Sequence, residues 1–176
     1  MGCIRVFIHG LESTSQGTKG LYFRARYPGM MIGDYEGSLE NRMARLEREL
    51  DGKENLILVG SSFGGLMAAI HTCTYPKDVL RLILLAPALN LPDFEPYLAE
   101  VVTMPVTVYH GRNDDVVPIA PVMTIAEKVF ANLEYHVVDD DHSLHETFAG
   151  MDWDKLLLWP EEAKPQAGKG DPGATT

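Results

Sequence analysis

A serine lies between two glycines directly after an apolar run. Gly60, Ser62 and Gly64 follow the run at residues 56–59, and another apolar segment begins at Leu66. An uninterrupted apolar run is typical of a buried parallel strand, and the later segment predicts a helix. A strand that turns sharply into a helix exposes the middle serine on a strained turn, where glycines avoid collision with neighbouring backbone. We interpret Ser62 as a nucleophile; a serine that only caps the helix is the alternative.

Two later loops carry the other groups that such a serine needs. A serine hydroxyl is a weak nucleophile, so it requires a base within hydrogen-bond reach and a third group that orients this base. In a parallel sheet, such groups lie in loops at the carboxyl ends of strands. The loop after residues 106–109 offers Asp114 and Asp115, and the loop after residues 133–138 offers His142. The residues alone leave the choice between the two aspartates open.

Other residues compete for these roles. Asp93, in the loop after an earlier strand-like segment, is a third candidate for the acid. We expect His142 rather than His145 to be the base, because His142 directly follows the last strand-like segment and His145 suits a solvent-facing helix position. His9 and His110 are expected to hold loop backbones by hydrogen bonds.

Strand-like and helix-like segments alternate along the chain. Apolar positions in 39–50 recur at helical spacing, so we predict an amphipathic helix that begins near Ser38 and ends at Gly52. Pro118 is well placed to start another helix. The alternation predicts an α/β fold, with an open, mostly parallel sheet of about six strands and helices on both faces. The strands are expected at residues 4–8, 30–32, 56–59, 80–86, 106–109 and 133–138.

The length of 176 residues favours one domain with a genuine core. We place the domain at residues 1–159. Residues 160–176 are rich in proline and glycine and contain no apolar side chain larger than alanine, so we expect a disordered tail.

Composition excludes several classes of function. The net charge of −10 argues against a nucleic-acid partner, which needs a basic surface. No apolar run is long enough for a membrane span, and the N-terminus does not resemble a signal peptide, so we expect a cytoplasmic protein without membrane contact. Cys3 and Cys73 lack metal or redox spacing. With no phosphate-binding or metal-ligand motif, we expect no cofactor and no metal.

Four motifs together resemble the α/β-hydrolase superfamily. They are the His-Gly turn at 9–10, the Gly-rich turn at 60–65, the G-x-x-D-x-x-V-P loop at 111–118 and the D-H-S-L segment at 141–144. Within that superfamily the chain is similar to small single-domain bacterial serine esterases of the YqiA-like group, over residues 4 to about 159. The order serine, aspartate, histidine is the one that this superfamily uses.

The resemblance implies a role for each candidate residue. Ser62 would be the nucleophile, Asp114 the orienting acid and His142 the general base. The backbone amides of Leu11 and Phe63 would form the oxyanion hole, which stabilises negative charge on the attacked carbonyl oxygen. The family spacing favours Asp114 over Asp115.

The chain departs from a full-size member of that superfamily in two ways. It begins at what would be the third strand, and only residues 91–105 separate the fourth and fifth expected strands, which is too little for a cap domain. We therefore expect a reduced fold with a shallow, open site that suits small or short-chain esters. Its walls are expected to include Glu12, Ser13, Ser61, Leu91, Val116 and Leu144.

The predicted function is a serine carboxylesterase that forms an acyl-enzyme from a small-molecule ester. A thioesterase or an acyltransferase would use the same residues, and a non-catalytic ligand-binding protein is the alternative from another class. The aspartates at 139–141, together with Asp115, predict an acidic rim that prefers neutral over anionic esters.

Overall fold

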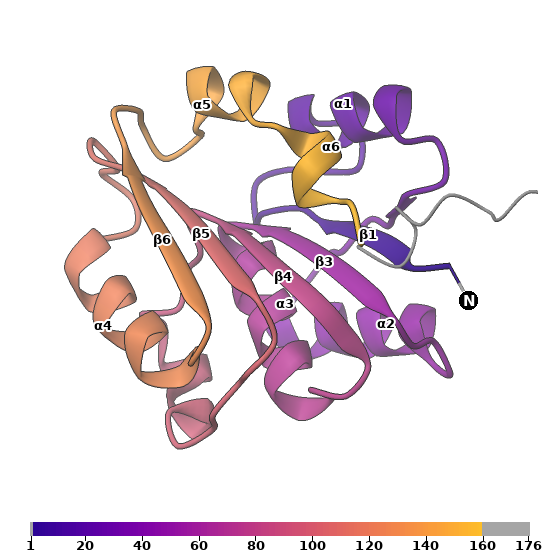
Figure 1. The fold of residues 1–176 in the computed structure, drawn as a ribbon, viewed down its shortest axis with the longest axis horizontal. Coiled ribbons are helices and arrows are strands. Elements are labelled where there is room, and N and C mark those ends of the chain that lie inside the picture. Colours follow the sequence, from indigo (N-terminus) through magenta and orange to yellow (C-terminus); the bar gives the residue numbers. More distant parts are fainter. Residues whose placement is uncertain (1, 160–176) are drawn as a thin grey trace, which may run out of the picture.

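Six parallel strands form one open sheet in the computed structural model, which describes residues 2–159 (Figure 1). The strand order is β2-β1-β3-β4-β5-β6, and every neighbouring pair is parallel. This confirms the predicted α/β sheet, with the short β2 at one edge. The strands are β1 (Ile4–Ile8), β2 (Met31–Ile32), β3 (Leu56–Ser61), β4 (Val79–Leu85), β5 (Val106–Gly111) and β6 (Leu133–Val138).

Helices cover both faces of the sheet (Figure 1). The helices α2, α3 and α4 pack on one face, and α1, α5 and α6 pack on the other. A short 3-10 helix, η1, follows β4, and the chain between β4 and β5 holds no cap domain. The bounds are α1 (Thr18–Arg26), α2 (Leu39–Leu50), α3 (Phe63–Thr74), η1 (Pro92–Tyr97), α4 (Ile119–Val129), α5 (His145–Gly150) and α6 (Trp153–Leu156).

Alternate strand residues build two separate cores, because successive side chains of a strand point to opposite faces. In β1, Val6 and Ile8 join the core under α2, α3 and α4, whereas Phe7 joins the core on the other face. That second core is aromatic: the ring centroids of Phe23 and Trp153 lie 4.7 Å apart, in an edge-to-face arrangement. It ties the N-terminal α1 to the C-terminal α6.

Helix α2 begins where the sequence predicts, but one of its charged residues lies inside the fold. The Ser38 side chain caps the helix by accepting a hydrogen bond from the Asn41 amide at 3.3 Å. The helical pattern places Arg42 among the polar positions, yet only 5% of this residue is exposed. Its guanidinium donates to the carbonyl of Gly37, in the loop before α2, and to the carbonyl of Leu11, in the loop after β1.

Several features differ from the sequence-based expectation. Helix α1 and η1 were not expected, and β5 continues through Gly111 instead of ending at Tyr109. The proposed tail at 160–176 lies outside the described residues. Across residues 2–159, every helix is too short or too polar to cross a bilayer.

Candidate active site

The serine turn has the strained backbone that the sequence predicts. Ser62 has φ 54° and ψ −115°, an unfavourable region for a residue with a side chain, and α3 begins at the next residue. A Cβ on Gly64 would collide with the carbonyl oxygens of Ile8 and His9, so glycine is required where α3 crosses β1. The turn therefore presents Ser62 at the carboxyl end of β3.

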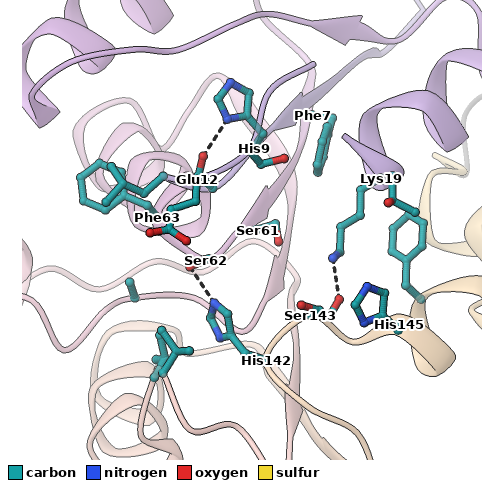
Figure 2. Close-up of a pocket in the computed structure, with 18 of the residues that line it drawn as sticks. Phe7, His9, Glu12, Lys19, Ser61, Ser62, Phe63, His142, Ser143 and His145 are labelled. Carbon is teal, nitrogen blue, oxygen red and sulfur yellow. Dashed lines mark hydrogen bonds between the residues drawn. The ribbon is translucent and has the colours of Figure 1, made fainter. Parts of the chain in front are cut away.

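His142 contacts both of its predicted partners. Its Nε2 lies 3.0 Å from Ser62 Oγ, a contact drawn as a dashed line in Figure 2, and its Nδ1 lies 2.8 Å from Asp114 Oδ2. A carboxylate only accepts, so Nδ1 carries a hydrogen and donates it to Asp114. The side chain of His142 is 20% exposed, which leaves it open to the cavity.

Asp114 has a fully buried side chain with donors around both oxygens. Oδ1 accepts from the amides of Val116 at 2.9 Å and Val117 at 2.8 Å, while Oδ2 faces His142 and lies 3.1 Å from His110 Nε2. Burial raises the pKa of Asp114, but the hydrogen bonds from Val117, His142 and Val116 outweigh this effect and hold the pKa below its ordinary value. Asp114 is therefore ionised at neutral pH.

His110 is a second histidine beside Asp114, at the same carboxylate oxygen as His142. As predicted, it holds loop backbone: its Nε2 is 2.9 Å from the Val117 carbonyl oxygen. Because a carbonyl only accepts, this nitrogen carries the hydrogen and is also directed toward Asp114. Its Nδ1 lies 2.7 Å from the Tyr135 hydroxyl, which is then the donor. The sequence pattern did not reveal the contact with Asp114.

The competing candidates lie elsewhere. Asp115 and Asp93 are exposed, and neither meets His142. The side chain of His145 is 67% exposed and lies 3.8 Å from Asp141. The structure thus brings together Ser62, His142 and Asp114, the set implied by the resemblance.

A cavity of about 710 Å³ opens over Ser62 and His142 (Figure 2). This volume is in the usual range for small-molecule sites, so it admits ligands larger than the short-chain esters expected from sequence. Five of the six expected wall residues line it: Glu12, Ser13, Ser61, Leu91 and Val116.

The sixth expected wall residue, Leu144, does not line the cavity, so that prediction is wrong. Its side chain is completely buried in the aromatic core, where it packs beneath the loop that carries His142. Its φ of 53° turns the chain at the start of α5, and this turn directs the side chain inward. Wall residues that the sequence analysis missed include Thr18, Lys19, Asn90 and Phe148. Those on α1 were missed because that helix was not expected.

The loop after β1 borders the cavity and is held by long-range contacts. His9 Nδ1 donates to the Gly10 carbonyl at 2.7 Å, and His9 Nε2 accepts from the Tyr35 amide at 3.0 Å, which confirms that His9 holds loop backbone. Arg42 donates to the Leu11 carbonyl at 3.3 Å. The residues proposed for the oxyanion hole, Leu11 and Phe63, both line the cavity.

Asp140 and Asp141, which lie near His142, accept hydrogen bonds from backbone amides. Asp140 accepts from the amides of Asp141 and Thr147, each at 2.8 Å, and Asp141 accepts from the amides of Ser143 and Leu144. These carboxylates shape the loop that holds His142. Within residues 2–159, no three side chains of the metal-binding types cluster closely enough to hold an ion.

Family comparison places the chain in a known group. Residues 13–104, just over half of the chain, match the model of the alpha/beta hydrolase fold family. The chain therefore belongs to the alpha/beta hydrolase family.

Individual relatives are more distant. A segment of 66 residues is 38% identical to the cis-3-alkyl-4-alkyloxetan-2-one decarboxylase of Shewanella oneidensis. It covers 35% of this chain and 21% of that protein, so the match spans about a fifth of the relative's length.

Solved structures share the architecture over most of their length. Mouse alpha/beta hydrolase domain-containing protein 10 has a TM-score of 0.72 at 21% identity, covering 91% of this chain and 90% of that chain. Est1E from Butyrivibrio proteoclasticus, bound to ferulic acid, has a TM-score of 0.75 at 16% identity, covering 93% of this chain and 90% of that chain. At these identities the likeness establishes the fold.

Proposed function

We propose that the protein is a serine hydrolase that cleaves carboxylic esters through an acyl-enzyme intermediate. The observation that carries the proposal is the hydrogen-bonded series Ser62, His142, Asp114, with contacts of 3.0 and 2.8 Å. Because Asp114 holds the hydrogen on His142 Nδ1, the Nε2 atom is left to accept the serine proton. Membership of the alpha/beta hydrolase family supports this chemistry.

The reaction follows from these positions. Ser62 Oγ attacks the ester carbonyl carbon while His142 Nε2 takes its proton, and the carbonyl oxygen becomes an oxyanion. When the tetrahedral intermediate collapses, the bond to the alkoxy group breaks and His142 returns the proton to the departing alcohol. Water then attacks the acyl-enzyme with His142 again as base, which releases the acid and restores Ser62.

Two amides are suited to stabilise the oxyanion. The Phe63 amide is the first of α3, and the initial amides of a helix have no carbonyl partner within the helix. They also lie at the positive end of the helix dipole. The Leu11 amide, in the loop after β1, would supply the second donor. Each such donor typically lowers the barrier by about 2.7–4 kcal/mol.

The same residues would accept related acyl compounds. A thioester or an acyl acceptor other than water would use an identical acyl-enzyme, so thioesterase and acyltransferase activities remain within the proposal. The oxetan-2-one named for the Shewanella oneidensis relative is a four-membered cyclic ester, which makes a β-lactone a reasonable addition to a substrate panel.

The first test is covalent labelling with a fluorophosphonate probe, followed by assays of esters and thioesters of increasing acyl length. We expect the wild-type protein to be labelled and Ser62→Ala to lose both labelling and turnover, with kcat lower by at least about 10⁴-fold. Circular dichroism would verify that the variant is folded.

Ser61→Ala is the matched control, because Ser61 lines the same cavity one residue before the nucleophile. It should keep labelling and turnover. If Ser61→Ala lost labelling and Ser62→Ala kept it, the assignment would be contradicted. A folded wild-type protein with neither labelling nor turnover would favour the non-catalytic, ligand-binding alternative.

A further inference from the structure

Among the described residues that line the cavity, Lys19 is the one lysine, and it lies at the end opposite Phe63. Lys19 is the second residue of α1, and Figure 2 shows its side chain directed to the same end of the cavity as Phe7, Ser143 and His145. Ser62 and His142 lie between this end and Phe63 in the view. A cation therefore lies to one side of the reacting atoms, inside the space that substrate would fill.

The Lys19 ammonium is incompletely paired. Its Nζ donates to the Ser143 carbonyl oxygen at 2.6 Å, and an ammonium group has three hydrogens to donate. Among the described residues, no carboxylate comes within the 4 Å that defines an ion pair with Lys19. Asp140 and Asp141 are the nearby acids, but both carboxylates already accept hydrogen bonds from backbone amides.

The surroundings make this charge costly. The Phe148 ring lies beneath Nζ, with the centroid 5.5 Å away; this cation–π contact offsets part of the cost, but the ring does not replace a hydrogen-bond acceptor. Burial lowers the pKa of Lys19, and the fields of Asp141 and Asp140 oppose this effect only in part. A partly desolvated ammonium with free hydrogens is stabilised strongly by an anion that enters the cavity.

We propose that the substrate carries a carboxylate, and that Lys19 binds it while Ser62 attacks an ester bond elsewhere in the same molecule. The inference rests on the proposed function and specifies its substrate class. A singly charged carboxylate fits better than a phosphate. Among the described residues that line the cavity, Lys19 is the only lysine and there is no arginine. This reverses the sequence-based preference for neutral esters, which assumed that the aspartates face the substrate.

The test compares matched pairs of anionic and neutral esters. Mono-4-nitrophenyl glutarate and 4-nitrophenyl pentanoate place or omit the carboxylate on the acyl side, whereas 4-acetoxybenzoate and phenyl acetate do so on the alcohol side. The measured quantity is the ratio of kcat/KM for the anionic ester to that for its neutral partner. Any effect of Lys19 on the loop of His142 acts on both esters and cancels in this ratio.

We expect Lys19→Met to lower the ratio about tenfold or more for one of the two pairs, because it removes a charge-assisted hydrogen bond but keeps an unbranched side chain only one atom shorter. Lys19→Arg should restore most of the ratio. In the wild-type protein the ratio should fall as sodium chloride is raised, and in Lys19→Met it should not. A ratio that is unchanged by Lys19→Met in both pairs would overturn the proposal.

A binding measurement separates this inference from the proposed function. Monomethyl glutarate and dimethyl glutarate would be titrated into Ser62→Ala, and into the same protein that also carries Lys19→Met, with NMR as the readout. Tighter binding of the monoester that is lost with Lys19 supports the anion site even if the wild-type protein hydrolyses nothing. Equal binding of the two compounds would overturn the site even if esters are hydrolysed.

Discussion

The two sides of the active site are held by different kinds of contact. On one side, Asp114, Asp140 and Asp141 accept hydrogen bonds from amides within a few residues along the chain, so each loop is shaped by its own carboxylates. On the other side, the loop after β1 depends on distant residues, since Tyr35 fixes His9 and Arg42 holds the Leu11 carbonyl. The loops of the acid and base are thus shaped mainly by near neighbours in sequence, with one distant contact from Lys19 to the Ser143 carbonyl, and the proposed oxyanion side is organised by tertiary packing.

Because the two sides are held differently, substitutions on each side should affect a different step of catalysis. Changes in the loops after β5 and β6 should act on proton transfer, because those loops hold the acid and base. Changes in α2 should act on the loop after β1, and through it on stabilisation of the oxyanion. Three variants test this separation.

The largest effect is expected from His142→Ala, which removes the base. Since the triad acts as a unit, kcat should fall by at least about 10⁴-fold, close to the loss in Ser62→Ala. His145→Ala is the control, because His145 is exposed and points to Asp141; it should keep most of the activity toward neutral esters. Steady-state kinetics on both purified variants gives the comparison, and the reverse ranking would show that the base is misassigned.

A smaller effect is expected from Arg42→Met. Arg42 donates to the Leu11 carbonyl and lies 5.4 Å from the centre of the Phe63 ring, so it touches both residues proposed for the oxyanion hole. Its loss should lower kcat about tenfold to a hundredfold, with little change in KM, because the oxyanion exists only in the transition state.

Arg45→Met is the matched control on the same helix, since Arg45 pairs with Glu49 at the surface. Its kcat should stay within about twofold of wild type, in line with the small value of exposed ion pairs. If Arg42→Met raised KM and left kcat unchanged, Arg42 would act on substrate binding and the loop argument would fail.

The smallest effect concerns acid stability and Asp140. Burial raises the pKa of Asp140, but hydrogen bonds from the Thr147 and Asp141 backbone outweigh this and lower it overall. A lowered folded-state pKa contributes stability above the unfolded pKa of about 3.9, and this contribution is lost as pH falls through the folded value. Asp140→Asn should cost about 1 kcal/mol at pH 7, and the difference from wild type should shrink below pH 4.

Urea denaturation between pH 7 and pH 2 measures this difference. Asp139→Asn is the control, because the exposed side chain of Asp139 accepts a long hydrogen bond of 3.4 Å from Asn113 and, within residues 2–159, no other. A gap between Asp140→Asn and wild type that stays constant down to pH 2 would exclude the charge of Asp140 as its source.

The local features of this molecule were predictable from sequence. Segments rich in apolar residues predicted all six strands, because strands that helices cover on both faces contain few polar residues. The serine turn, the pair Asp114 and Asp115, and His142 all follow strands, so the sheet rule places them at one edge; the choice of Asp114 came from the resemblance. The backbone role of Asp140 and Asp141 was not predicted, because their sequence positions were interpreted as an acidic rim.

The features set by tertiary packing were not predictable. Arg42 lies on a helix whose pattern predicts an exposed residue at this position. Its burial depends on a hydrogen bond to the carbonyl of Leu11, which is 31 residues away along the chain. Leu144 was placed in the cavity because a loop position does not reveal the direction of its side chain. Lys19 was missed because α1 combines a weak apolar pattern with a glycine at its start.

The contact between α3 and β1 has a practical consequence for altering this enzyme fold. Because Gly64 leaves no room beneath the carbonyls of Ile8 and His9, backbone packing fixes how closely α3, which begins after Ser62, approaches the end of β1. The far walls, among them Leu91 and Val116, come from side chains. A mutant library confined to those wall positions can therefore search for new substrates while the reacting groups keep their separation.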